Sequence, residues 1–187
     1  MTELENVFEI RTIPCKFGIG ATDEIGSAVR QMKVQKVLIL CGQMISGHTD
    51  IPEKVKTLIE KEKVDVKIWD KIDPDSSMQS LEEAKVLLRE NEFDCFVGIG
   101  GGSTIATSKI IDLYSTYSEN FLDFIPSPFG KGKRVPGRIK PLILLPTTAG
   151  SGSEASEVAN FEILDGSGKK RKIAILSEYL LLRSSIL

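Results

Sequence analysis

Asp94-Cys95-Phe96-Val97-Gly98-Ile99-Gly100-Gly101-Gly102-Ser103 runs from a short apolar segment, typical of a buried strand, into a run of glycines. Residues 104–111 follow without Gly or Pro and place apolar side chains at helical spacing. A strand that enters a helix through glycines leaves backbone N–H groups free at the positive end of that helix, where phosphate binds well. A glycine run alone is a weak motif, and a tight turn that binds nothing fits it equally well.

Composition narrows the class of protein. The 187-residue chain is 41% hydrophobic and carries a formal net charge of −2, which suits one sizeable core and gives no sign of a nucleic-acid-binding surface. Three widely spaced cysteines lack metal-type spacing and predict reduced, mostly buried thiols. No apolar run approaches the length of a membrane span, and the N-terminus lacks the features of a signal peptide. We therefore expect a cytoplasmic protein with neither nucleic acid nor a membrane as its partner.

Apolar segments alternate with helical patterns along the chain. Strands are predicted within 8–17 and at 36–41, 64–69, 94–97 and 141–145, and helices at 22–32, 52–63, 80–90 and 104–114. Strands and helices that alternate at this spacing predict an α/β fold, with a Rossmann-like parallel sheet and helices on both faces.

Two of these helices carry recognisable starting signals. Thr22 is expected to cap the first, with Asp23 and Glu24 in its first turn. Ser80 and Glu83 offer a capping box for the helix at 80–90.

Residues 120–140 differ from the rest of the chain because they are rich in Pro, Gly and basic side chains. They predict a long irregular excursion, either a functional loop or a solvated surface loop. A charged run usually faces water, which favours the solvated loop.

Ligands of parallel sheets bind outside the carboxyl ends of the strands. Gly42 and the segment from Gly98 to Ser103 both fall at such ends, so these two loops are expected to line one crevice. A third loop, Pro146 to Glu154, is dense in hydroxyl and backbone N–H groups that can bind ribose, adenine or phosphate. It can also be read as an ordinary turn in which Ser151 or Ser153 caps a helix. Together the loops favour a nucleotide site.

The glycine run with Lys109, followed by Pro-Thr-Thr-Ala-Gly-Ser-Gly-Ser-Glu at 146–154, resembles the iron-containing (group III) alcohol dehydrogenase family. Segments 17–21 and 169–173 extend the resemblance over nearly the whole chain, while 112–114, 121–124 and 130–133 are similar to its hydroxyacid-oxoacid transhydrogenase branch. The resemblance implies that residues 1–187 form a dehydroquinate synthase-like N-terminal domain that binds NAD or NADP. In the family, a C-terminal helical domain holds a divalent metal, usually iron.

The resemblance also implies roles for individual residues. The cradle for the pyrophosphate would be formed by the backbone of Gly100, Gly101, Gly102 and Ser103. The adenine or ribose side of the cofactor would meet Thr147 and Thr148, and a phosphate would meet Ser151. Either Lys169 or Lys172 would contact the cofactor, with Lys172 our choice for the site.

Two positions depart from the family at the cofactor. The family commonly has Asp three residues after the serine of its glycine motif, toward the nicotinamide end, where this chain has Ala106. Thr107 is the nearest polar candidate to replace it. Many relatives that prefer NAD have Asp near Gly42, after the strand, and a carboxylate there binds the ribose hydroxyl and repels a 2′-phosphate. Gly42 therefore predicts that NADP is tolerated.

A third departure concerns the metal. The family's metal is held by one Asp and three His from the helical domain, whereas this chain has one histidine, His48, expected in a solvent-facing loop. We assign no catalytic or metal-binding role to any residue of this chain. Residues 184–187 end it where a strand should lead toward the helical domain, so we expect the cofactor-binding half without the metal domain.

The function that follows is hydride transfer between NAD(P) and a small alcohol or hydroxy acid, with this chain binding the dinucleotide weakly and catalysing little. The alternative is a catalytically inactive nucleotide-binding or interaction module. Glycerol dehydrogenase-like and dehydroquinate synthase-like enzymes fit the 146–154 motif less well. Apolar surface left exposed beside a missing domain predicts self-association, so a homodimer is expected.

Overall fold

The computed structural model describes residues 13–74, 77–117, 120–181 and 185–186. The strands are β1 (Cys15–Lys16), β2 (Lys36–Cys41), β3 (Asp65–Trp69), β4 (Cys95–Gly100), β5 (Leu142–Pro146), β6 (Val158–Leu164), β7 (Lys170–Leu176) and β8 (Ser185–Ile186). The α-helices are α1 (Ile25–Met32), α2 (Gln43–His48), α3 (Ile51–Glu60), α4 (Met78–Glu90) and α5 (Gly102–Tyr117). Short 3-10 helices are η1 (Ala21–Glu24), η2 (Phe121–Phe124), η3 (Ser153–Ala155) and η4 (Glu178–Leu180).

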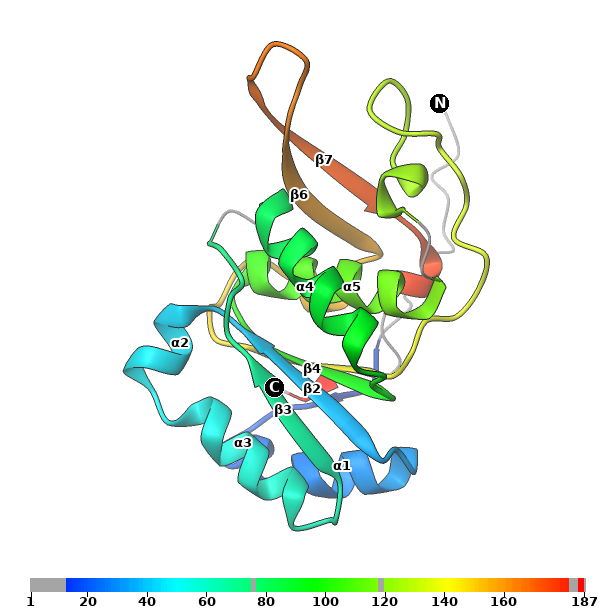
Figure 1. The fold of residues 1–187 in the computed structure, drawn as a ribbon. Helices are drawn as coiled ribbons and strands as arrows, with labels where there is room; N and C mark the ends of the chain where they lie inside the picture. The colour runs from blue at the N-terminus through cyan, green and yellow to red at the C-terminus, as the bar shows by residue number, and fades with distance from the viewer. Residues whose placement is uncertain (1–12, 75–76, 118–119, 182–184, 187) are drawn as a thin grey trace, which may run out of the picture.

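A four-stranded parallel sheet with the order β3-β2-β4-β5 forms the centre of the fold (Figure 1). The chain first moves from β2 outward to β3 and then crosses to β4 on the other side of β2. The strand order therefore reverses between β2 and β4, and a crevice opens at the carboxyl ends of these two strands. The predicted α/β fold with a parallel sheet is confirmed.

Both faces of this sheet are covered, α1 and α3 lying on one and α4 and α5 on the other (Figure 1). Alternate side chains of β2 therefore enter two different cores. Leu38 and Leu40 pack with α4 and α5, while Val37 and Ile39 pack with α1 and α3. A strand covered on both faces must be apolar at every position, which explains the uninterrupted apolar run.

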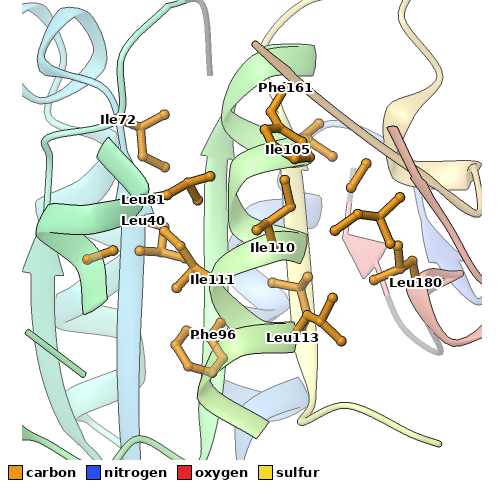
Figure 2. Packing of buried hydrophobic residues seen from close by; sticks show 14 of the residues in the cluster. Leu40, Ile72, Leu81, Phe96, Ile105, Ile110, Ile111, Leu113, Phe161 and Leu180 are labelled. Atoms are coloured by element: carbon orange, nitrogen blue, oxygen red, sulfur yellow. The ribbon is translucent and has the colours of Figure 1, made fainter. Parts of the chain in front are cut away.

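Helix α5 is buried on nearly all sides because it lies between the sheet and the antiparallel hairpin formed by β6 and β7. Figure 2 shows Ile111 of α5 beside Leu40 and Phe96 of the sheet, with Phe161 of the hairpin on the opposite side of the helix. Gly98 allows α5 to approach β4, since a Cβ there would lie only 2.6 Å from Ser108 Oγ of the helix.

The two predicted helix starts are wrong in detail. Thr22 lies in η1 and its side chain caps no helix. Helix α4 begins at Met78 with Ser77 as its N-cap, so the capping box built on Ser80 does not form. Ser80 is instead buried, and its hydroxyl accepts a hydrogen bond from the N–H of Asp73 (2.9 Å) and donates one to the carbonyl of Lys71 (3.0 Å). The Ser80 hydroxyl that a capping box would use is therefore engaged in tertiary hydrogen bonds to the backbone of Lys71 and Asp73.

Helix α2 was not predicted, because its six residues are too few to show a period. His48 is its last residue rather than part of a loop, and it is exposed to solvent as expected. Most of 120–140 is irregular, with η2 as its helical turn. Its Lys131 and Lys133 each lie 3.1 Å from a carboxylate oxygen of Asp123. Of the predicted strand within 8–17, residues 8–12 lie outside the described part of the chain.

Candidate functional site

The carboxyl ends of β2, β4 and β5 border a cavity of about 800 Å³, which we call the main cleft. It lies where the strand order reverses, the usual ligand position in an open parallel sheet. The residues predicted for the site that line it are Gly42, Gly101, Gly102, Ser103, Thr147 and Thr148. Three loops far apart in the sequence thus meet at one hollow, which is the geometry expected from the sequence.

Gly100 and Ser151 do not line the main cleft, but each contacts a residue that does. The carbonyl of Gly100 accepts a hydrogen bond from the N–H of Thr147 (3.0 Å), which joins the loops after β4 and β5. Ser151 lies against Gly102, where a Cβ would come within 3.1 Å of the serine Cβ. Gly102 is therefore packed tightly on its protein side.

Lys109 fixes the loop after β5 to helix α5. Its side chain is fully buried, and its Nζ donates to the carbonyl oxygens of Ser153 (2.7 Å), Ser156 (2.5 Å) and Val158 (3.5 Å). Burial lowers the pKa of Lys109 to about 8, and the nearby Glu154 carboxylate opposes that shift. In the sequence, the only signal for this residue is its place in the family motif.

A second cavity of about 460 Å³ shares the lining residues Gly102 and Ser103 with the main cleft, and we call it the hairpin cavity. Ala106 of α5 lines one side, and Asn160 and Lys172 of the β6–β7 hairpin line the other. Of the two hairpin lysines left open by the sequence, Lys172 lines this cavity. Lys169 lies at the hairpin turn, where its N–H donates to Asp165 Oδ1 (3.0 Å).

Thr107 does not replace the carboxylate that Ala106 lacks. Ala106 lines the hairpin cavity, whereas Thr107 is fully buried and its hydroxyl has no hydrogen-bond partner in the described structure. The two side chains leave the helix in different directions, as adjacent helical residues do. At this position the hairpin cavity is therefore lined by the methyl group of Ala106 and not by a carboxylate.

Asp73 lines the main cleft although it was not among the predicted site residues. In the sequence it belongs to a turn with Pro74, and the available signal was its position just after β3, at the same sheet edge as Gly42. Lys71 and Glu83 also line the cleft, with 3.9 Å between Lys71 Nζ and Glu83 Oε2.

Within the residues that the structure describes, no three His, Cys, Asp or Glu side chains are grouped so that they could hold a metal ion. His48 Nδ1 lies 3.2 Å from the carbonyl oxygen of Met44 on its own helix. The described residues thus do not fit the iron of the family. Among the same residues, no helix has both the length and the apolar character that a membrane span requires.

Comparison with known proteins places this geometry in a family. Residues 14–187 match the family model described as iron-containing alcohol dehydrogenase. The mitochondrial hydroxyacid-oxoacid transhydrogenase of Bos taurus is 35% identical over 156 residues, which cover 83% of this chain and 33% of that protein. The chain therefore spans about a third of the length of this curated relative.

Solved structures agree with the fold. The iron-containing alcohol dehydrogenase of Thermococcus thioreducens superposes with a TM-score of 0.82 at 26% identity, covering 97% of this chain and 46% of that one. Sulfoacetaldehyde reductase of Bifidobacterium kashiwanohense, solved in complex with NAD+, gives a TM-score of 0.80 at 22% identity, covering 96% and 46%. On the match over residues 14–187, the chain belongs to the iron-containing alcohol dehydrogenase family.

Proposed function

We propose that this chain is the dinucleotide-binding part of an NAD(P)-dependent alcohol dehydrogenase that acts on a small alcohol or hydroxy acid. The observation that carries the proposal is the main cleft, in which the loops after β2, β4 and β5 meet at the reversal of strand order. Sulfoacetaldehyde reductase of Bifidobacterium kashiwanohense, which has the same fold, was solved in complex with NAD+, and this supports the choice of ligand. When bound, the cofactor supplies the nicotinamide ring that accepts or donates the hydride.

The pyrophosphate of the cofactor binds at the first turn of α5. Helix α5 has 16 residues and begins at Gly102, so its positive end and its first N–H groups face the main cleft. The missing Cβ atoms of Gly101 and Gly102 let the phosphates approach this backbone. Thr147 and Thr148, whose hydroxyls can donate or accept, bind the adenine or ribose side.

Lys172 directs the nicotinamide half into the hairpin cavity. This cavity and the main cleft share Gly102 and Ser103 as lining residues, and Lys172 is the lysine that lines the hairpin cavity. A dinucleotide whose pyrophosphate sits on α5 can extend one half toward Gly42 and the other past Ser103. Lys172 then contacts the cofactor, as the family resemblance implies.

Two observations favour the second candidate function, a nucleotide-binding module without catalysis. Ala106 lines the hairpin cavity where the family has a carboxylate, and the described residues hold no cluster of metal ligands. Binding of NADH, together with no reduction of NAD⁺ by small alcohols or hydroxy acids with and without added Fe²⁺, would favour this candidate over the dehydrogenase.

Titration with NADH tests the proposed site. The titration follows the emission of Trp69, the only tryptophan, which ends β3 and is 7% exposed. Energy transfer to a bound reduced nicotinamide should decrease this emission. Gly102→Val should weaken binding by about tenfold or more, because its side chain meets Ser151 and the path of the phosphates. Gly47→Val is the matched control, since nothing lies within 4 Å of a Cβ at Gly47. A titration without any response, or equal binding by both variants, would refute the site.

Two further sequence predictions belong to the same proposal. A cytoplasmic location is tested by fractionation of cells that express the chain. Assembly as a homodimer is tested by sedimentation velocity.

A further inference from the structure

The segment that follows β3 lies directly over the end of β2. The N–H of Ile72 donates to the carbonyl of Cys41, the last residue of β2 (3.2 Å). A Cβ on Gly42 would lie 2.9 Å from the carbonyl oxygen of Ile72. The space that an aspartate at position 42 would need is therefore occupied by the backbone that leads to Asp73.

Asp73 is held firmly at this place. Its N–H donates to Ser80 Oγ (2.9 Å), and its Oδ2 accepts a hydrogen bond from the hydroxyl of Ser77, the N-cap of α4. Its Oδ1 accepts no hydrogen bond from any described residue. A carboxylate has room for about four acceptor contacts, so Asp73 keeps acceptor capacity for a ligand in the main cleft.

Among the charged side chains that line the main cleft, Asp73 carries the negative charge that is not offset by a neighbour. The charged residues that line it are Lys71, Asp73 and Glu83. Lys71 and Glu83 face each other at 3.9 Å, which offsets one charge against the other. The remaining negative charge belongs to Asp73, one residue beyond the carbonyl that touches the Gly42 position.

We propose that Asp73 selects NAD over NADP by accepting the ribose hydroxyls of the adenosine half and repelling a 2′-phosphate. The inference rests on the proposed dinucleotide site. Gly42 by itself predicts that NADP is tolerated, because no carboxylate follows β2. Asp73, which follows the neighbouring strand β3, supplies a carboxylate at the same place. The chain can therefore still discriminate NAD from NADP.

The test compares NADH with NADPH by calorimetry on the whole chain and on Asp73→Asn. Asparagine retains an oxygen for the Ser77 hydroxyl and removes only the charge. Asp70→Asn is the matched control, because Asp70 is also next to β3, accepts from Ser46 Oγ (2.8 Å) and does not line the main cleft. Circular dichroism establishes that each variant is folded.

The wild-type chain should bind NADH at least about tenfold more tightly than NADPH, and Asp73→Asn should reduce that ratio about tenfold. Asp70→Asn should keep the wild-type ratio. Equal or tighter binding of NADPH by the wild-type chain overturns the inference while the dinucleotide site stands. An equal change of the NADH-to-NADPH ratio in Asp73→Asn and Asp70→Asn overturns it as well, because the loss of any nearby negative charge would then explain the preference. If neither dinucleotide binds the wild-type chain, the proposed function fails and the inference fails with it.

Discussion

Replacement of Lys109 by Met should loosen the loop after β5 and destabilise the whole domain. The substitution keeps the length of the side chain but removes the donor for three carbonyl oxygens, two of them at 2.7 and 2.5 Å. The hydroxyl of Ser156 lies 3.2 Å from the carbonyl oxygen of Ser153 and 3.3 Å from that of Val158, and its single proton can be donated to one of them at a time. The carbonyl of Ser156 itself loses the donor that Lys109 supplies.

The expected cost follows from these contacts. A hydrogen bond to a charged group contributes about 1.5–3 kcal/mol, and a buried acceptor left without a partner costs about 1–3 kcal/mol. Relief from burying the ammonium offsets part of this loss. We expect a net destabilisation of about 3 kcal/mol, which lowers the melting temperature of a domain of this size by roughly 6–12 °C.

Thermal and urea unfolding of Lys109→Met measure this loss, with Lys67→Met as a control at an exposed position on β3. NADH binding should weaken as well, because Thr147 and Thr148 belong to the loop that Lys109 holds. A melting temperature within a degree or so of the wild type would refute the assigned role of the three hydrogen bonds.

The pH dependence gives a second check on Lys109. Folding lowers its pKa from 10.5 to about 8, so between these values the unfolded chain binds more protons than the folded one. Its contribution to the free energy of unfolding therefore rises with pH across this interval. The stability difference between wild type and Lys109→Met should widen from about pH 8 upward, and an unchanged difference would contradict the shift.

Two further predictions concern stability and assembly. Asp112 is fully buried, its Oδ1 accepts from the N–H of Lys140 (3.2 Å), and burial raises its pKa, so the folded state keeps a proton that the unfolded state releases. Stability should fall as the pH rises above about 4, and Asp112→Asn should reduce this fall in urea titrations; a parallel decline in both proteins would count against it. Leu164 and Leu176 on the hairpin are 66% and 70% exposed, which favours self-association as a homodimer. Sedimentation velocity should show a concentration-dependent dimer that Leu176→Ser weakens, and a monomer at all concentrations would contradict this expectation.

The sheet was predictable because β2, β4 and β5 are buried on both faces and therefore carry nearly unbroken apolar runs, while β3 alternates between buried and exposed side chains. The glycine turn was predictable for a related reason, since it follows such a strand and opens a helix. The loops that gather at the main cleft followed from the rule for carboxyl ends of parallel strands. Each strand and each turn is encoded by a pattern within about ten residues of sequence, and the topology of the sheet then brings the separate loops together.

The remaining features depend on contacts between distant segments. Ser80 has the sequence of a capping residue, yet its hydroxyl is used by the backbone of residues 71 and 73. The choice between Lys169 and Lys172 follows from the register of the β6–β7 hairpin, in which Lys172 pairs with Glu162 beside the hairpin cavity. Asp73 gains its importance only because its loop covers the end of β2. Such relations arise from tertiary packing, and no local pattern encodes them.

Helix α5 lies between two layers, with the sheet on one side and the β6–β7 hairpin on the other (Figure 2). Its first turn therefore has little freedom to rearrange when a ligand arrives, so a cofactor would lose little affinity to the ordering of this backbone. The amide protons in the middle of α5 should exchange with solvent only through opening of the entire domain. A cofactor that binds the folded state alone would then slow their exchange even at positions that it never touches.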